Sequence, residues 1–457
     1  MEPGPYSVYL HIPFCRRRCA YCDFNTYAGL EDLHAAYIRA LEAEIHYLGQ
    51  QAATRGEPHP LPSPRRGGGT AAIGRPHGSP LPTVVDRGSR ADTTPSPLGR
   101  GEGPGEGGLD ANRRLSIHTV YFGGGTPSLL APAHYERLLT ALADAFHLLP
   151  DAEITLEANP GTVDTAYLAA LRGLGFNRLS LGMQSARPEE LRLLGREHDF
   201  PAVIRAVAAA RKAGFANLNL DLIYGLPGQR LEDWQTSLEW ALRLAPEHLS
   251  LYALTLEHGT PLRAWVQRGL VPPIDDDAAA DMYEWAAERL ERAGFQQYEI
   301  SNWARPGFAC RHNLQYWRSQ PYLGLGAGAH GWVAGQRTVN VRAPAAYIAR
   351  LQNPPARPVR PFPWTPATVH LRRLSRGEAL GEYMMMALRL TREGARWDEV
   401  RRRFGVEPRA VFADALERCT AAGLLEPTPT GVRLTPRGRL LANRVFAAFL
   451  PEPEAVP

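Results

Sequence analysis

A regular alternation of strand-like and helix-like segments is the feature that most limits the folds open to this 457-residue chain. Short segments rich in apolar residues predict strands, and longer segments with apolar residues at helical spacing predict helices. The two kinds of segment follow each other about six times, which predicts an α/β fold with a parallel sheet, because parallel strands need crossover connections. The expected strands are 6–12, 118–124, 153–160, 178–185, 217–227, 248–255 and 297–304, and the expected helices are 31–50, 132–148, 164–174, 188–213, 231–244 and 276–293.

Residues 52–113 interrupt this alternation between the first helix and the second strand. They are rich in Gly, Pro, Arg and Ser and show no apolar period. Such a segment buries too little apolar surface to offset the entropy lost on ordering, so we expect a disordered insertion. An ordered lid that binds a partner is the alternative. Residues 1–51 and 114–350 are then two parts of one domain.

The last third of the chain has a different pattern. Residues 305–360 are rich in glycine, and we expect them to be irregular. Residues 376–446 predict a small, mostly helical domain that ends in a short hairpin and a final helix, a winged-helix-like pattern. DNA binding is one interpretation of that pattern. We favour an accessory domain, because the arginines at 401–403 are typical of a solvated helix face.

Composition narrows the location and the partners. The net charge of +4 is small for this length, so we expect no nucleic-acid partner. The N-terminal residues lack the charged and apolar regions of a secretory signal, and no run approaches the roughly 20 apolar residues of a membrane span. We expect a cytoplasmic protein. Clustering of three of the five cysteines is also unlike a disulfide framework.

The three clustered cysteines, Cys15, Cys19 and Cys22, directly follow the first expected strand. Three thiolates on one loop can ligate three irons of a [4Fe–4S] cubane and leave the fourth iron open for another ligand. A structural zinc site with His11 as the fourth ligand is the rival interpretation of the cysteines alone. Cys310 and Cys419 lie elsewhere, and we expect them to be buried as small apolar residues.

The segment YLHIPFCRRRCAYCDF resembles the opening of radical S-adenosylmethionine (SAM) proteins. It is particularly similar to the group that contains oxygen-independent coproporphyrinogen III dehydrogenases and the HemW-type haem chaperones. The resemblance covers about 6–50 and 118–350, and more weakly the C-terminal domain. It implies a partial (β/α)6 radical SAM barrel, a small C-terminal domain of the HemN type, a [4Fe–4S] cluster on the three cysteines, and SAM as the open iron's ligand.

The same resemblance implies which residues contact SAM. A Gly-Gly-Gly-Thr-Pro turn follows the second expected strand, where glycines allow the backbone to approach a ligand. Carboxylates and polar residues follow the later strands, and the ends of parallel strands meet at one face of a barrel. The implied SAM-binding residues are Tyr9, Tyr21, Gly124, Gly125, Thr126, Glu157, Gln184, Arg196, Asp221 and Thr255.

Two features distinguish the chaperone from the oxidase within this resemblance. The oxidase pattern places a fourth cysteine where this chain has Phe24, and it carries a longer N-terminal extension. The chain instead contains the HemW-type motif HNxxYW. That motif implies haem binding by His312, Asn313, Tyr316 and Trp317. Imidazole nitrogen is a ligand of haem iron, and aromatic faces suit a flat macrocycle. The alternative is that these side chains fill the core.

These observations lead to a haem chaperone as the expected function. It would bind haem and deliver it to apo-haemoproteins such as respiratory enzymes, some of them membrane-associated, and the resemblance implies a homodimer. A radical SAM enzyme of the oxygen-independent coproporphyrinogen III oxidase type is the alternative. A zinc-stabilised module with a winged-helix domain is a third hypothesis. The catalytic residues of an enzyme are not identified by the sequence.

Overall fold

The computed structural model describes residues 4–54, 114–355 and 358–451. Nearly all of the predicted insertion, from 55 to 113, lies outside the described residues, so its disorder stays a prediction. Helix α1 (His34–Thr54) continues to the edge of that gap and includes residues 52–54. A short 3-10 helix (Glu31–Leu33) precedes α1.

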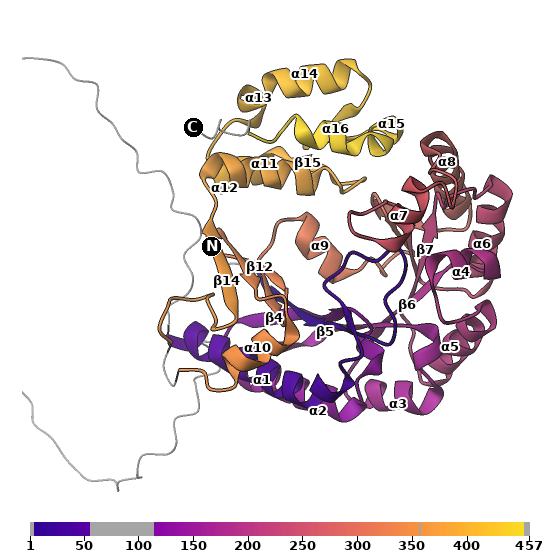
Figure 1. Cartoon of the computed structure of the whole chain (residues 1–457). Coiled ribbons are helices and arrows are strands. Elements are labelled where there is room, and N and C mark those ends of the chain that lie inside the picture. The colour runs from indigo at the N-terminus through magenta and orange to yellow at the C-terminus, as the bar shows by residue number, and fades with distance from the viewer. Residues whose placement is uncertain (1–3, 55–113, 356–357, 452–457) are drawn as a thin grey trace, which may run out of the picture.

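Six parallel strands form the centre of the molecule, as the alternation predicts (Figure 1). Their order in the sheet equals their order in the chain, so each crossover helix brings the chain to the neighbouring position. This arrangement confirms the α/β class and the partial (β/α)6 barrel. The strands are β1 (Tyr6–Ile12), β4 (Ser116–Gly124), β5 (His147–Ala158), β6 (Arg178–Gln184), β7 (Leu218–Tyr224) and β8 (His248–Ala253).

The crossover helices lie outside the curved sheet (Figure 1). Three of them begin at an aspartate whose carboxylate accepts a backbone N–H bond in the first turn, namely Asp164, Asp199 and Asp275. This cap satisfies a donor that has no partner within the helix. The helices after α1 are α2 (Pro132–Ala145), α3 (Thr165–Gly173), α4 (Pro188–Leu194), α5 (Phe200–Lys212), α6 (Leu231–Arg243), α7 (Pro261–Gln267) and α8 (Asp276–Arg292).

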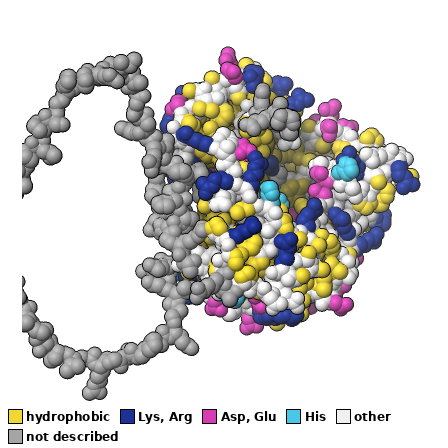
Figure 2. Space-filling view, turned by 60° about the vertical axis from the view of Figure 1, so that its left-hand side comes forward, with side chains coloured by type: hydrophobic (Ala, Val, Ile, Leu, Met, Phe, Trp, Pro, Cys, Tyr) yellow, Lys and Arg dark blue, Asp and Glu magenta, His cyan; other side chains and the backbone are white. Residues whose placement is uncertain are grey.

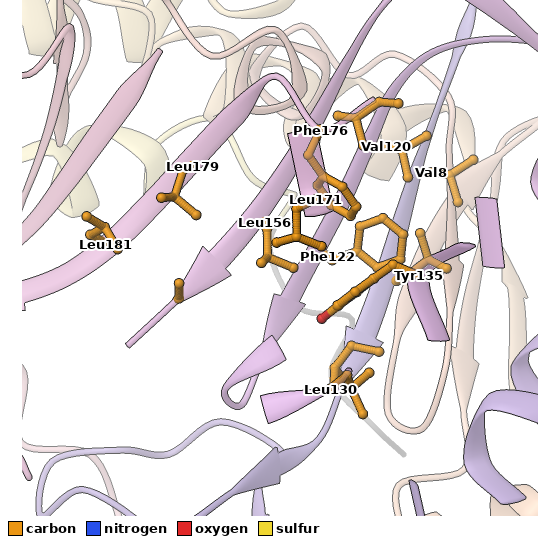
Figure 3. Close-up of a cluster of buried hydrophobic side chains, with 14 of the residues drawn as sticks. Val8, Val120, Phe122, Leu130, Tyr135, Leu156, Leu171, Phe176, Leu179 and Leu181 are labelled. Carbon is orange, nitrogen blue, oxygen red and sulfur yellow. The ribbon is translucent and has the colours of Figure 1, made fainter. Parts of the chain in front are cut away.

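Alternate side chains of each strand face opposite sides of the sheet. Val120 and Phe122 of β4 are fully buried beneath the helices, whereas Tyr121 between them lines the interior of the barrel. The Phe122 ring packs edge-on against Tyr135 of α2, with 5.1 Å between ring centroids. Figure 3 shows this outer core, which holds the helices on the sheet and leaves the inner side chains free for a site.

The prediction of one strand over 297–304 is wrong. The segment forms a hairpin of β9 (Gln296–Glu299) and β10 (Asn302–Ala304), and β10 runs antiparallel to β8. The turn is held from outside the segment, since the Tyr283 hydroxyl donates to the Ile300 carbonyl oxygen at 3.0 Å. The hairpin therefore ends one edge of the barrel sheet.

The prediction of irregular structure over 305–360 is also wrong. The segment contains α9 (Arg311–Trp317), β11 (Tyr322–Leu325), β12 (His330–Val333), β13 (Gln336–Asn340) and α10 (Pro344–Leu351). Strand β11 pairs parallel with β1, and β12, β13 and β14 (Thr368–Arg373) extend the sheet in antiparallel pairs. Glycines permit this close pairing: a Cβ at Gly324 would lie 1.8 Å from the carbonyl oxygen of His330.

The C-terminal domain has its own hydrophobic core and lies against one side of the barrel (Figure 1). All three arginines at 401–403 pair with glutamates of their own region, and Arg403 also donates to the Ser319 carbonyl oxygen at 2.9 Å. The domain contains α11 (Arg376–Ala387), β15 (Ala395–Arg396), α12 (Trp397–Phe404), α13 (Pro408–Val411), α14 (Ala413–Ala421), β16 (Leu425–Thr428), β17 (Gly431–Leu434), α15 (Pro436–Leu440) and α16 (Ala442–Ala447).

Candidate radical SAM site

The cysteine loop leaves β1 and crosses one end of the barrel. It contains two short strands that pair in parallel, β2 (Phe14–Cys15) and β3 (Tyr27–Ala28). Cys15, Cys19 and Cys22 are free and partly exposed, and all three line one cavity of about 420 Å³. The structure therefore brings the three thiols together at the face where the parallel strands end.

Each thiol has a polar neighbour. The Thr126 hydroxyl donates to Cys15 Sγ at 3.6 Å, and Arg196 Nη1 donates to Cys19 Sγ at 3.4 Å. Cys22 Sγ lies 3.8 Å from the Thr26 hydroxyl oxygen. Burial raises the pKa of the Cys15 and Cys22 thiols, which favours their protonated forms. A bound cation reverses that preference, because thiolate is the form that ligates metal.

The glycine turn at the end of β4 fits closely against the start of the cysteine loop. The N–H groups of Gly125 and Thr126 donate to the carbonyl oxygens of Ile12 and Phe14, at 2.8 and 2.7 Å. Gly124 has φ +115°, and a Cβ there would lie 2.4 Å from the His11 ring. Only glycine fits that conformation and space. The turn lines the cavity with backbone and holds Thr126 beside Cys15.

Two carboxylates lie inside the barrel on β5 and β7, the strands on either side of β6. Glu157 accepts hydrogen bonds from the Tyr121 hydroxyl at 2.9 Å and from the Gly124 N–H at 3.0 Å. Asp221 accepts from the Ser180 hydroxyl at 2.9 Å. Burial, reinforced by the negative charge of Asp221, raises the pKa of Glu157 to about 7. Near neutral pH this carboxyl group can therefore accept or donate a hydrogen bond to a ligand.

Arg196 and Gln184 complete the wall beside the cysteine loop. Besides Cys19, Arg196 donates to the Gly182 carbonyl oxygen at 3.1 Å, and its Nε is buried without a hydrogen-bond partner among the described residues. Gln184 ends β6 with φ +64°, an uncommon conformation for a residue other than glycine. A buried guanidinium group with a free donor is suited to a carboxylate ligand.

Nine of the ten residues expected to contact SAM line this cavity. Thr255 is exposed at its rim. Tyr9 is the exception and does not line the cavity: its hydroxyl bonds to His11 Nδ1 at 3.0 Å, and its ring stacks near Tyr121. The nine that line the cavity are Tyr21, Gly124, Gly125, Thr126, Glu157, Gln184, Arg196, Asp221 and Thr255.

His11 has no free nitrogen for a metal ion. Its Nε2 donates to the Asn25 carbonyl oxygen at 2.9 Å, and its Nδ1 accepts from the Tyr9 hydroxyl. Burial lowers the pKa of His11, which agrees with a neutral ring that donates through one nitrogen and accepts through the other. These bonds disfavour the zinc site with His11 as the fourth ligand.

The HNxxYW residues lie on α9, which packs across the interior side of β4. His312 is 1% exposed, and both of its nitrogens are bonded: Nδ1 to the Thr119 hydroxyl oxygen at 2.7 Å and Nε2 to the Tyr316 hydroxyl at 2.8 Å. Burial lowers its pKa to about 3. Asn313 lines the same cavity as the cysteines, and Trp317 lies under the Arg389 guanidinium group.

The cavity is also lined by polar residues that the sequence analysis did not select. Arg178 begins β6 and is 2% exposed, and its Nε lacks a hydrogen-bond partner among the described residues. A detectable signal was present, because polar residues recur at every second position of these otherwise apolar strands. The unselected polar residues are Arg178, Ser180, Asn219, Ser250 and Tyr252.

The fold and this site define a radical SAM protein. The family model of the radical SAM superfamily matches residues 108–241, and that of the HemN C-terminal domain matches residues 374–441. The solved structure of coproporphyrinogen III oxidase (HemN) from Escherichia coli has a TM-score of 0.71 and 23% identity, over 98% of this chain and 90% of that chain. This likeness confirms the fold.

The chain belongs to the HemW family within that superfamily. It is 38% identical to the protein of Mycobacterium tuberculosis named heme chaperone HemW, over 98% of this chain and 96% of that protein. It is 31% identical to the protein of the same name in Bacillus subtilis, over 98% of this chain and 99% of that protein. Within residues 4–54, 114–355 and 358–451, no helix has the length and apolar character to cross a membrane.

Proposed function

We propose that this chain is a haem chaperone, which binds haem and transfers it to apo-haemoproteins. The observation that carries the proposal is the similarity, along nearly the whole chain, to proteins named heme chaperone HemW. The exposed Phe24, in place of the fourth cysteine of the oxidase pattern, supports the chaperone over coproporphyrinogen III oxidation. Respiratory enzymes are the predicted recipients. A cytoplasmic location, a homodimer and contact with membrane-associated recipients remain predictions.

We infer that Cys15, Cys19 and Cys22 hold a [4Fe–4S] cluster. The three thiols line one cavity and have polar neighbours, which suits ligands of a cluster. When it is bound, the reduced cluster can supply the electron that cleaves the sulfonium of SAM. Thr126 and Arg196 donate to the sulfur atoms, and hydrogen bonds of this kind tune the potential of a cluster.

The lining of the cavity supports SAM as the second ligand. Arg196 offers its unpartnered Nε to a carboxylate, and the bare backbone of Gly124 and Gly125 leaves room beside the thiols. Glu157 and Asp221 accept from cationic or hydroxyl groups, which matches the amino and ribose groups of SAM. Tyr9 does not line the cavity, and its hydroxyl bonds to His11, whose ring lies beside the glycine turn.

We propose that α9 belongs to the haem-handling region. Asn313 lines the cavity. Tyr316 and Trp317 follow on the same helix, where the Tyr316 ring packs against Tyr322 and the Trp317 ring lies under the Arg389 guanidinium group. The bond of His312 to Thr119 joins α9 to β4, and its second nitrogen is bonded within the helix to Tyr316. Ligation of iron through Nε2 of His312 would require its bond to Tyr316 to break, whereas the bond of Nδ1 to Thr119 could remain.

Haem titration of the anaerobically reconstituted protein tests the function. We expect a saturable change in the Soret band, followed by transfer of the haem to apomyoglobin as a probe recipient. Absence of saturable binding would contradict the chaperone. If the protein converts coproporphyrinogen III to protoporphyrinogen IX, with SAM and reductant under anaerobic conditions, it is an enzyme and not a chaperone alone.

A further inference from the structure

Two runs of three arginines differ in how the chain neutralises them. The run at 401–403 lies on α12, and all three of its side chains pair with glutamates. The run at 16–18 lies in the cysteine loop, where its side chains are exposed and no carboxylate of the described residues pairs with them. Figure 2 shows a face on which basic side chains are scattered among apolar and acidic ones. The run at 16–18 therefore presents three consecutive positive charges to a partner outside the chain.

These three arginines lie between two ligands of the proposed cluster. Residues 16–18 connect Cys15 to Cys19 along the chain, and Arg17 and Arg18 line the mouth of the cavity that contains the thiols. Arg18 Nη2 also donates to the Phe24 carbonyl oxygen at 3.4 Å, which holds the guanidinium group against the segment after Cys22. The charges are thus part of the loop that would hold the cluster.

The proposed cluster needs an electron from outside the chain, because only its reduced form can cleave a sulfonium. Glu157 and Asp221, which are expected to contact SAM, lie inside the barrel on the inner side of the cysteine loop. Residues 16–18 are exposed on the same loop. A donor that docks on these residues would approach the cluster through the thickness of one loop, and electron transfer is faster over a shorter distance.

The size and charge of this surface suit a transient protein partner. Redox encounters between proteins are weak and bury less than about 1,200 Å² in total, so a few side chains suffice. Guanidinium groups pair with carboxylates, and complementary charge raises the rate of association by roughly 10- to 1,000-fold. Phe24 adds an exposed aromatic ring, with 63% of its surface accessible.

An acidic protein fits this surface better than an anionic lipid does. Asp23 precedes Phe24 directly and is also exposed. Insertion of the Phe24 ring into a bilayer would bring that carboxylate to the apolar boundary, where a charge is costly. A protein partner leaves Asp23 in water, because the rims of protein interfaces stay polar and accessible to solvent.

We propose that residues 16–18 and Phe24 form the docking surface for a small acidic protein that carries one electron on a flavin or an iron–sulfur group. The partner is oxidised by one electron and the cluster is reduced by one, so no bond forms or breaks. This proposal rests on the proposed [4Fe–4S] cluster and deepens it, because it assigns the source of the electron and the place where that source binds.

Stopped-flow reduction of the anaerobically reconstituted full chain tests the docking surface, with reduced flavodoxin as the acidic probe donor. The visible absorbance of the cluster reports its reduction. In the loop variant, Arg16→Gln with Arg17→Gln and Arg18→Gln, we expect the second-order rate constant at low salt to fall by roughly tenfold or more. In the wild type the rate constant should fall as salt is added, because salt screens exposed charges.

A matched control removes the same charge from other surfaces. Arg205→Gln, Lys212→Gln and Arg292→Gln, combined in one chain, replace exposed residues of α5 and α8 and should keep the wild-type rate constant. Reduced methyl viologen, a small cationic donor, needs no docking surface, so its rate constant should not fall in the loop variant. An equal fall with both donors would show that the arginines act on the cluster itself, and would overturn the docking surface.

The outcomes separate the docking surface from the cluster itself. An unchanged rate constant with flavodoxin in the loop variant would overturn the docking surface and leave the cluster standing. A wild-type rate constant that does not respond to salt would overturn it as well, and this measurement holds even if the loop variant assembles no cluster. Loss of binding to anionic phospholipid vesicles, with unchanged reduction by flavodoxin, would reassign the arginines to lipid. Absence of iron and sulfide in the reconstituted wild type would overturn the proposed cluster first.

Discussion

At the scale of single residues, the site depends on side chains that meet from different parts of the chain. Cys19 and Arg196 are 177 positions apart in the sequence and are joined by a hydrogen bond of 3.4 Å. Thr126 and Cys15 are 111 positions apart and are similarly joined. A cluster bound by the three thiols would therefore have polar neighbours from the segments that follow β4 and α4.

Substitution of Cys19→Ser should abolish cluster assembly, because a serine hydroxyl is not a soft thiolate ligand. We expect iron and acid-labile sulfide to fall to background after anaerobic reconstitution, while the far-ultraviolet circular dichroism stays that of the wild type. Cys419→Ser, in the C-terminal domain, is the control and should keep its iron and sulfide. Retention of the cluster in Cys19→Ser would contradict the assignment of the ligands.

Glu157 should make the stability of the apoprotein depend on pH. Its pKa rises from 4.5 to about 7 on folding, so the native state holds the proton more tightly than the unfolded chain. That contribution is complete below pH 4.5 and is lost as the pH rises to 7. Between pH 4.5 and 7 the free energy of unfolding should therefore fall less for Glu157→Gln than for the wild type. The difference between the two decreases should be on the order of 2–3 kcal/mol.

Urea denaturation of the apoprotein at pH 5 and pH 8 measures this difference. Glu136→Gln, which replaces an exposed glutamate of α2, is the matched control and should follow the wild-type dependence. An equal change in the free energy of unfolding for Glu157→Gln and the wild type would show that the buried carboxyl group does not hold the proton.

At the scale of elements, strands β11 to β14 and helix α9 were not evident in the sequence. The strands are short, and several of them contain glycine. Gly324 lies where β11 meets β12, so close that a Cβ would overlap the His330 carbonyl group. Helix α9 is fixed by hydrogen bonds to β4 rather than by a long apolar stripe, since His312 bonds to Thr119. Contacts between elements, rather than local propensity, decide these structures.

Gly324→Ala should disrupt the pairing of β11 with β12. The added methyl group would lie 1.8 Å from the His330 carbonyl oxygen, so the backbone has to move. We expect the free energy of unfolding to fall by about 2–3 kcal/mol, as for other overpacked sites. Gly377→Ala in α11, where a Cβ has no neighbour within 4 Å, is the control and should change stability by about 0.5 kcal/mol. Equal stability of the two variants would contradict the crowding argument.

At the scale of the whole molecule, the C-terminal domain contacts the barrel through the hairpin and α9. Arg389 Nη2 lies 3.7 Å from Glu299 Oε2, and the side chain of Glu299 is fully buried. The same guanidinium group lies over the ring of Trp317, with 4.4 Å to the centroid. The HNxxYW motif is thus one point at which the two domains are connected.

Arg389→Ala should destabilise the protein because it leaves Glu299 buried without a cation. We expect the free energy of unfolding to fall by on the order of 2 kcal/mol, and Glu299→Gln in the Arg389→Ala background to restore part of it. Arg318→Ala is the matched control, because its pair with Glu393 is exposed and is expected to contribute at most about 1 kcal/mol. Failure of Glu299→Gln to restore stability would show that Arg389 acts through Trp317 instead.

The class of the fold, the cysteine loop and most of the cavity lining could be predicted from the sequence. Strand and helix periods are local properties, and residues that follow parallel strands must meet at one face of the sheet. Nine of the ten residues expected at the SAM site therefore line one cavity, although they were selected from separate motifs. Tyr9 does not line that cavity, because its hydroxyl bonds to His11.

The direction and pairing of the remaining groups depend on contacts between segments that are far apart in the chain. The turn of the hairpin bonds to Tyr283, which is 17 positions from Ile300. His312 bonds to Thr119, 193 positions away, and Glu299 pairs with Arg389, 90 positions away. His330, Val339 and His370 share one face of the sheet because Val339 of β13 lies opposite His330 of β12 and opposite His370 of β14. Such relations are set by packing between distant segments, and no local period in the chain carries them.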